Sequence, residues 1–221
     1  MSVTEIALRL LISAVVGYLL GSLPSGVIVG RVFGNVDPRA GGSGKTGATN
    51  VLRTMGKGPA IMVAVLDVAK GAAAVLLARF IFLPAGPGAS LELQNLSAVA
   101  QAVGGLAALL GHNYSVFIHF TGGRGVATGA GALLAMTPLG MLIGVVGLVV
   151  VVLLTRYVSL GSITAAALAA IVTVVLTLLG HDLWPHAVFA VIGSAFIIAS
   201  HKDNIERLLH GTERKLGQPA T

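Results

Sequence analysis

Glycine, hydroxyl and basic residues crowd one stretch of this 221-residue chain. Four of the seven residues from Gly41 to Gly47 are glycine, so consecutive backbone N–H groups there can converge on an anion. The hydroxyl and basic side chains of the stretch are Ser43, Thr46, Thr49, Lys45 and Arg53. This composition favours an anion site over the alternative, a flexible loop whose basic residues only mark the cytoplasmic side of a membrane.

The same stretch contains a partial nucleotide-binding motif. Gly44-Lys45-Thr46 matches the end of the P-loop pattern G-x-x-x-x-G-K-[ST], but Arg39 takes the place of the first glycine. An apolar run of helix length precedes the loop, where a P-loop follows a strand. We therefore do not expect nucleotide hydrolysis.

Three further groups of polar residues separate later apolar runs. Gly122 and Gly123 precede Arg124 at the expected beginning of a helix, which is typical of an anion seat. The other two groups are Arg156 with Ser159 and Ser162, and His201 with Asn204 and Arg207. Each has an ordinary explanation, such as a topology anchor or a helix cap. Together, without a cluster of carboxylates, they indicate a site that handles phosphate groups.

Two charged residues and six histidines need separate interpretations. Asp67 and Lys70 are three residues apart within an apolar run, and we expect them to pair. No two histidines stand at helical ligand spacing: His112 and His119 are seven apart, and His181 and His186 are five apart. We expect neither a metal site nor a cofactor.

The elements that position these residues follow from the composition. The chain is 55% hydrophobic and 10% charged, with a mean hydropathy of +0.93 and no cysteine. Soluble domains carry roughly 25% charged residues, so a soluble enzyme, a disordered chain and a disulfide-stapled module are excluded. The net charge of +6 does not indicate a nucleic-acid partner, because aromatic residues are only 5% and the basic residues form short clusters between apolar runs.

Seven apolar runs predict an all-α polytopic membrane protein with seven transmembrane helices. They cover about residues 5–30, 59–83, 96–111, 125–136, 138–155, 162–179 and 184–200. Residues 125–155 are too long for one span and are expected to turn at Pro138. With the N-terminus outside and the C-terminus cytoplasmic, 11 of the 14 Lys and Arg residues fall in cytoplasmic loops and none in the outer loops near 84–95, 137–140 and 180–186. We expect one domain over 1–221 and no cleaved signal peptide.

The polar groups and their order resemble one known family. Gly42 to Asn50 with Arg53, Asp67 with Lys70-Gly71, Gly111-His112 with Gly122 to Thr128, Arg156 to Leu160, and His201 with Asn204 are similar to the motifs of the integral-membrane acyl-phosphate:glycerol-3-phosphate acyltransferases, the PlsY type. The resemblance covers about residues 21–217.

The resemblance implies a bacterial inner-membrane enzyme whose active site faces the cytoplasm. It implies transfer of a fatty acyl group from acyl-phosphate to the 1-hydroxyl of glycerol 3-phosphate, giving lysophosphatidate and phosphate, the first acylation of phospholipid synthesis. The implied catalytic residues are His201, Asn204 and Ser43. The implied substrate-binding residues are Gly42, Ser43, Gly44, Thr49, Asn50, Arg53, Gly123, Arg124, Ser159 and Ser162.

The chain departs from the family's usual residues at four positions. The family usually has Asn at Lys45, Pro at Ser115, and Lys at Thr121 and Arg124. Lys45 brings one charge where Thr121 loses one, so we expect the total charge of the site to be kept in another arrangement.

Two roles are open for His201. It could be a general base for the glycerol hydroxyl, or it could orient that hydroxyl or a phosphate while a substrate phosphate oxygen takes the proton. We favour orientation, because Asp203 and Glu206 lie off the helical face that His201 would share with Asn204.

A transporter of a phosphorylated metabolite is the main alternative function. Such folds place their glycine-rich breaks near the middle of the bilayer and show internal repeats. Here the polar groups are expected on one face, and no repeat is visible.

Overall fold

A computed structural model describes residues 1–82 and 88–218 of the chain. These residues form helices, and the only strand-like pairing among them is an isolated bridge between Ser115 and Thr121. The long helices are α1 (Val3–Ser22), α4 (Lys57–Ile81), α5 (Leu91–Asn113), α6 (Val126–Met136), α7 (Pro138–Thr155), α8 (Val158–Leu178) and α9 (Trp184–Ala199). The short helices are α2 (Ser25–Val32), α3 (Ala48–Met55), α10 (Lys202–Leu209) and the one-turn helices η1 (Pro38–Ala40) and η2 (Val116–Ile118).

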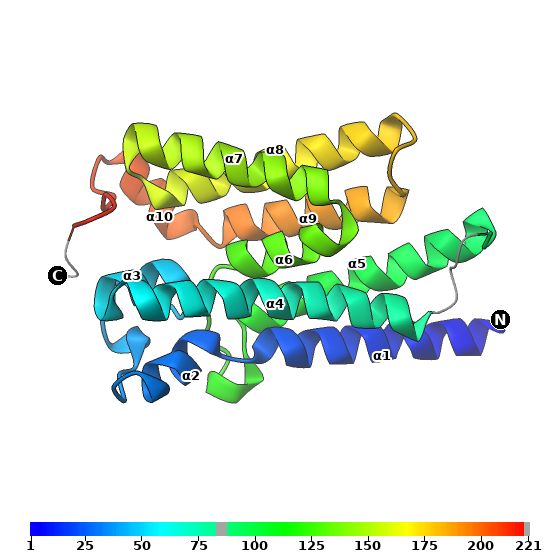
Figure 1. Ribbon diagram of the computed structural model, residues 1–221, viewed down its shortest axis with the longest axis horizontal. Helices are drawn as coiled ribbons and strands as arrows, with labels where there is room; N and C mark the ends of the chain where they lie inside the picture. Colours follow the sequence, from blue (N-terminus) through cyan, green and yellow to red (C-terminus); the bar gives the residue numbers. More distant parts are fainter. Residues whose placement is uncertain (83–87, 219–221) are drawn as a thin grey trace.

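The long helices run side by side in a bundle, with α7 and α8 on one side and α1 and α4 on the other (Figure 1). The short helices α2, α3 and α10 gather at the end of the bundle where the C-terminus also lies, called here the α3–α10 end (Figure 1). The N-terminus lies at the opposite end. The polar groups of the sequence therefore meet at the α3–α10 end.

Among the described residues, five helical segments are long and apolar enough to cross a membrane, and the pair α9 and α10 makes a sixth if it counts as one span. The protein is therefore a multi-pass membrane protein. The helix α6 is shorter than a span, with 11 residues. The predicted separation of α6 from α7 is confirmed, because Pro138 begins a new helix after Thr137.

The first expected run, 5–30, is broken into two helices at Leu23 and Pro24. Proline has no N–H to donate and disfavours the α conformation in the residue before it, so α1 ends there and α2 begins again at Ser25. The seventh run was expected to continue through His201, but α9 ends at Ala199 and α10 turns away by 58°.

Three boundaries also differ from expectation. The helix α5 begins at Leu91, five residues before the expected run, because the Ser90 hydroxyl accepts a hydrogen bond from the backbone N–H of Leu93 at 3.3 Å. The helix α8 begins at Val158 and α4 at Lys57. The expected end of a span at residue 83 and the first residues of the 84–95 loop lie outside the described residues.

Small residues let the helices approach closely. A Cβ on Gly17 or Gly21 of α1 would run into the backbone of Gly104 or Ala108 on α5. Close backbone contact through small residues is the usual packing of membrane helices, which cannot use the hydrophobic effect between them. The core that backs the polar residues is built from aliphatic and aromatic side chains of α4, α5, α6 and α9, among them Val75, Leu109, Leu133, Phe189 and Ile197.

Candidate functional site

A cavity of about 360 Å³ extends from the α3–α10 end into the bundle. Its polar lining residues are Ser43, Lys45, Thr49, Asn50, Arg53, Asp67, His112, Arg124, Ser162, Ser194 and His201. Its apolar lining comes from α6, α7, α8 and α9 and includes Leu133, Met141, Val145, Leu148, Phe189 and Ile197. The α9 wall from Phe189 to Ile197 is roughly 12 Å long at 1.5 Å per residue. One cavity therefore combines a cationic mouth with an apolar arm.

The glycine-rich stretch is held in shape by one buried amide. The Nδ2 of Asn50 donates to the carbonyl oxygens of Pro38 at 2.7 Å and Lys45 at 2.8 Å, while its Oδ1 accepts from the backbone N–H of Ser43 at 2.8 Å. A Cβ on Gly42, whose φ is +63°, would collide with that Oδ1. Asn50 therefore organises the loop, and Ser43 is the loop residue it sets beside the cavity.

The helix α3 presents its N-terminus to the cavity. Gly47, Ala48 and Thr49 line it, and Arg53 follows on the next turn of α3. A helix N-terminus carries a partial positive charge and unpaired N–H groups that suit an anion. Gly42 and Gly44 shape this loop, but neither lines the cavity.

Arg124 reaches the cavity from the turn before α6. Burial lowers its pKa, and the charges of Arg207 and Arg53 lower it further against the opposite effect of Glu213 and Asp203. Its Nε is buried without a hydrogen-bond partner among the described residues. Guanidinium groups keep their charge, so this crowding of cations is relieved by an anion bound between them.

Burial also lowers the pKa of Arg53, and the neighbouring Arg207 and Arg214 add to that effect while Glu213 opposes it. Arg53 and Arg124 thus face one cavity, and the pKa of each is lowered by burial and by neighbouring arginines. This arrangement is what a doubly charged phosphate group can neutralise.

The Gly122-Gly123 pair is not a free anion seat. The Gly123 N–H donates to the carbonyl oxygen of His112 at 3.1 Å, and Gly123 lines a separate, smaller hollow instead of the main cavity. Close contact with His112 explains the pair: a Cβ on Gly122 would meet the His112 carbonyl, and a Cβ on Gly123 would meet its ring. The Gly123 N–H, expected at a phosphate, is therefore committed to His112 in this structure, and the substrate-binding role of Gly123 stays a prediction.

His201 lies at the bend between α9 and α10, 3% exposed, and lines the cavity. Its Nδ1 lies 2.8 Å from the carbonyl oxygen of Ile197, so Nδ1 carries the proton and Nε2 is the acceptor in the neutral ring. Burial lowers the pKa of His201, the hydrogen bond to Ile197 raises it and the charge of Arg124 lowers it again, with a net lowering.

Asn204 and Ser159 do not line the cavity, because a carboxylate that sequence reasoning missed holds both. Oε1 of Glu213 accepts from Asn204 Nδ2 at 2.7 Å and from Ser159 Oγ at 2.8 Å, and its Oε2 accepts from Arg207 Nε at 2.8 Å. Burial alone would raise the pKa of Glu213, but these hydrogen bonds outweigh it and hold the pKa below its ordinary value. His201 and Asn204 were expected on one helical face, but the bend separates their surroundings.

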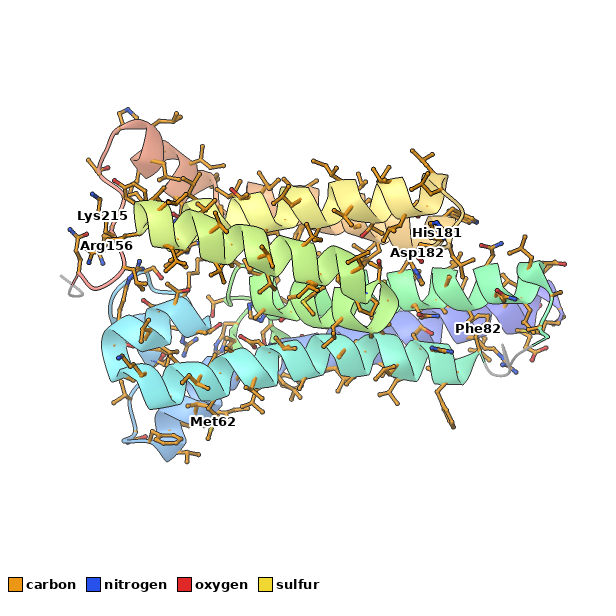
Figure 2. All side chains as sticks on the ribbon, turned by 45° about the horizontal axis from the view of Figure 1, so that its top comes forward. Met62, Phe82, Arg156, His181, Asp182 and Lys215 are labelled. Carbon is orange, nitrogen blue, oxygen red and sulfur yellow. The ribbon has the colours of Figure 1, made fainter. Side chains whose placement is uncertain are left out.

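The segment after α10, which contains Glu213, lies against the loop between α7 and α8 and so brings Glu213 to Ser159. The Arg156 guanidinium donates to the Leu216 carbonyl at 2.7 Å, and the backbone carbonyl of Arg156 accepts from the Leu216 N–H at 2.7 Å. Arg156 and Lys215 lie together at the α3–α10 end (Figure 2). The sequence signal for this contact was a glutamate that directly precedes the basic pair Arg214 and Lys215.

Asp67 and Lys70 pair as predicted, with Oδ1 and Nζ 2.9 Å apart. The carboxylate, together with His112, lines the cavity, whereas Lys70 turns away and donates to the Leu23 carbonyl at 2.9 Å. Neither Asp67 nor His112 was expected at the cavity. Ser162 lines it, with its hydroxyl bonded to the Val158 carbonyl at 2.9 Å.

Of the two positions at which the chain was expected to exchange a charge with the family pattern, only one lies at the cavity. Lys45 lines the cavity, but Thr121 lies outside it and accepts a hydrogen bond from Arg39 at 3.2 Å. The cation next to position 121 is therefore Arg39, which also pairs with Asp37 at 2.7 Å. Within residues 1–82 and 88–218, no three potential metal ligands come together.

Comparisons with known proteins match nearly the whole chain. The model of the glycerol-3-phosphate acyltransferase family matches residues 11–211. A relative from Dehalococcoides mccartyi (strain CBDB1), glycerol-3-phosphate acyltransferase 3, is 45% identical over 96% of this chain and 98% of its own length. Two crystal structures of PlsY (YgiH), an integral membrane glycerol 3-phosphate acyltransferase, are also similar. The glycerol 3-phosphate form has a TM-score of 0.79 and 36% identity over 94% of this chain and 96% of its own. The lysophosphatidic acid form has 0.78 and 35% over 94% and 95%.

Proposed function

Because this chain belongs to the glycerol-3-phosphate acyltransferase family and is a membrane acyltransferase of the PlsY type, we propose that its acyl donor is an acyl-phosphate. The products are then 1-acyl-glycerol 3-phosphate and inorganic phosphate. The main observation behind this proposal is that Arg53, Arg124 and His201 line the same cavity as the apolar residues of α6 to α9. An acyl-phosphate has the same two halves, a phosphate head and a hydrocarbon tail.

The substrates divide the cavity between them. The apolar arm along α9 receives the acyl chain, and Arg53, Arg124, Ser43 and the N-terminus of α3 bind phosphate groups. Relatives of this type have been solved in glycerol 3-phosphate and lysophosphatidic acid forms, which supports the same acceptor and product here. No cofactor or metal is required.

The reaction needs positioning more than covalent help from the protein. The 1-hydroxyl of glycerol 3-phosphate attacks the acyl carbonyl carbon, a new C–O ester bond forms, and the C–O bond to phosphate breaks with its electron pair leaving on phosphate. The hydroxyl proton goes to a phosphate oxygen. Arginines next to the departing phosphate stabilise its developing charge, the kind of preorganised electrostatic help that usually dominates.

His201 orients the glycerol hydroxyl. Its Nδ1–H is committed to Ile197, so Nε2 accepts a hydrogen bond from the hydroxyl. The lowered pKa of His201 disfavours an imidazolium beside Arg124, and this favours orientation over general-base catalysis. Asn204, held by Glu213, donates its backbone N–H to the His201 carbonyl at 2.9 Å and so supports the bend.

The orientation in the membrane belongs to the same proposal. Residues 1–221 form one acyltransferase domain of the bacterial inner membrane, with seven spans, the N-terminus outside and the C-terminus cytoplasmic. The α3–α10 end carries Arg53, Arg156, Arg207 and Lys215, which the positive-inside rule assigns to the cytoplasm. The active site then faces the compartment that contains glycerol 3-phosphate.

The test is an assay of the purified protein with radiolabelled glycerol 3-phosphate and one acyl donor at a time. Acyl-phosphate is expected to give labelled lysophosphatidate, and acyl-CoA and acyl-carrier-protein are expected to give none. Equal rates with acyl-CoA would contradict the proposed donor.

A further inference from the structure

We propose that Lys70, Asp67 and His112 form a positioning network that fixes the Gly122-Gly123 turn and thereby sets Arg124 at the cavity. The inference rests on the proposed role of Arg124 as a phosphate ligand. It assigns a task to two buried charges of the membrane-spanning helix α4 that the reaction itself does not use.

The network begins at the break between α1 and α2. Pro24 interrupts the helix, so the Leu23 carbonyl loses its helical donor and accepts only the Ser25 N–H, at 2.9 Å, from the described backbone, which leaves room for a second donor. Lys70 Nζ supplies it at 2.9 Å and lies 2.9 Å from Asp67 Oδ1 as well. Lys70 is 7% exposed and Asp67 2% exposed, so both charges depend on these partners.

The second step joins α4 to α5. The same oxygen of Asp67 lies 3.5 Å from Nδ1 of His112, near the C-terminus of α5. Neither atom has a hydrogen-bond partner among the described residues, so this contact is electrostatic: the carboxylate favours the proton on Nδ1, and the close fit of the ring against Gly123 fixes its plane. The opposite edge of the ring, with Nε2, therefore faces Gly123 in a defined orientation.

The third step joins His112 to the turn through two contacts. Its carbonyl oxygen accepts from the Gly123 N–H at 3.1 Å, and its ring fills the space that a Cβ on Gly123 would occupy. Gly122 is packed against the same carbonyl. Arg124 comes next in the chain, so the position of its backbone is determined by His112.

A charge within α4 thus controls an arginine that it does not touch. If the ring of His112 tilts, the turn moves and Arg124 leaves the phosphate position, and a displacement of about 1 Å can cost about a hundredfold in rate. The expected signature is weaker use of glycerol 3-phosphate, which a mere loss of stability does not produce.

The first experiment compares two buried Asp–His pairs. Asp67→Asn removes the network's carboxylate, and Asp182→Asn removes that of the Asp182–His186 pair, whose atoms are 2.6 Å apart. Asp182 lies at the end of the bundle opposite Arg156 and Lys215 (Figure 2). Both variants are expected to lower Tm, but only Asp67→Asn is expected to raise the KM for glycerol 3-phosphate, by about tenfold or more. An unchanged KM in folded Asp67→Asn would overturn the proposal.

The second experiment measures the contact between His112 and Gly123 directly. Gly123→Ala forces a Cβ into the ring and is expected to lower kcat/KM about a hundredfold. His112→Asn keeps a donor for Asp67 but removes the ring edge. The double variant is expected to be at least about tenfold more active than Gly123→Ala alone, because the new Cβ then has room.

Losses that simply multiply in the double variant would show that His112 does not position the turn. The unmodified protein is assayed first with acyl-phosphate, and failure there concerns the proposed function. In that event the Tm of the same four proteins still decides the inference, since relief of the clash restores stability in the double variant only if the ring and Gly123 are in contact.

Discussion

Oε1 of Glu213 accepts a hydrogen bond from Asn204 Nδ2 at 2.7 Å, which fixes the orientation of the Asn204 amide. The Oδ1 of Asn204 is therefore turned away from the carboxylate, and it is buried without a partner within the part of the chain that the structure describes. The Asn204 side chain is thus anchored to a residue of the C-terminal tail, nine positions later in the chain.

Glu213→Ala, which removes the carboxylate, is expected to lower Tm and kcat more than Glu213→Gln, which removes only its charge. Glu213→Ala leaves Asn204 and Ser159 buried without an acceptor, at about 1–3 kcal/mol for each group. Glu213→Gln keeps one acceptor oxygen and loses only the charge toward Arg207, so Tm and kcat should fall less. Glu206→Gln on exposed α10 is the control and should change neither. Equal Tm and kcat in the Ala and Gln variants would contradict this account.

Arg53→Ala is expected to weaken the use of glycerol 3-phosphate by about tenfold or more. A charge-assisted hydrogen bond contributes roughly 1.5–3 kcal/mol, and about 1.4 kcal/mol is tenfold. Arg124→Lys, which keeps the charge, should be milder than Arg124→Ala. The measurement is kcat/KM of the purified variants, with exposed Arg31→Ala as the control. Unchanged kinetics in folded Arg53→Ala would remove Arg53 from the site.

Substitution of His201 distinguishes its two possible roles, orientation of the hydroxyl and general-base catalysis. Glutamine can accept a hydrogen bond but cannot titrate, so His201→Gln should keep measurable turnover, while His201→Ala should be severely impaired. General-base catalysis is typically worth 10²–10⁴-fold, so an inactive His201→Gln would point to proton transfer instead.

The pH dependence of stability tests the environment of His201. Its pKa in the folded protein is lowered, so the unfolded chain binds the proton first as the pH falls below about 6.5. Stability should therefore be full above that pH and be lost as the pH falls toward the folded pKa. His201→Gln should reduce this loss, measured as Tm against pH in detergent. A pH profile of Tm identical to that of the unmodified protein would show that His201 does not contribute.

The topology can be tested because the chain contains no cysteine. Seven spans place Gly58 and Thr212 on the cytoplasmic side and His181 outside. Single cysteines at these exposed positions should be labelled by an impermeant reagent from the corresponding side only. Labelling of positions 58 and 212 from opposite sides would mean that α6 and α7 cross as one span.

The sequence alone determined the class of the protein and most of its elements. Apolar runs separated by short polar groups predict membrane helices, because each such helix satisfies its own backbone hydrogen bonds and needs no distant partner. The split at Pro138 followed from the same local rule. The motif order was enough to identify the family, and the cavity includes the expected Ser43, Thr49, Arg53, Arg124 and His201.

The tertiary structure decided what each polar residue contacts. Glu213 reaches Ser159 across 54 positions, and Asp67 reaches His112 from another helix. Gly122 and Gly123 looked like an anion seat, yet they are glycines because His112 lies against them. Contacts between residues far apart in the sequence depend on how the helices pack, and the spacing of residues within one segment carries no information about that packing.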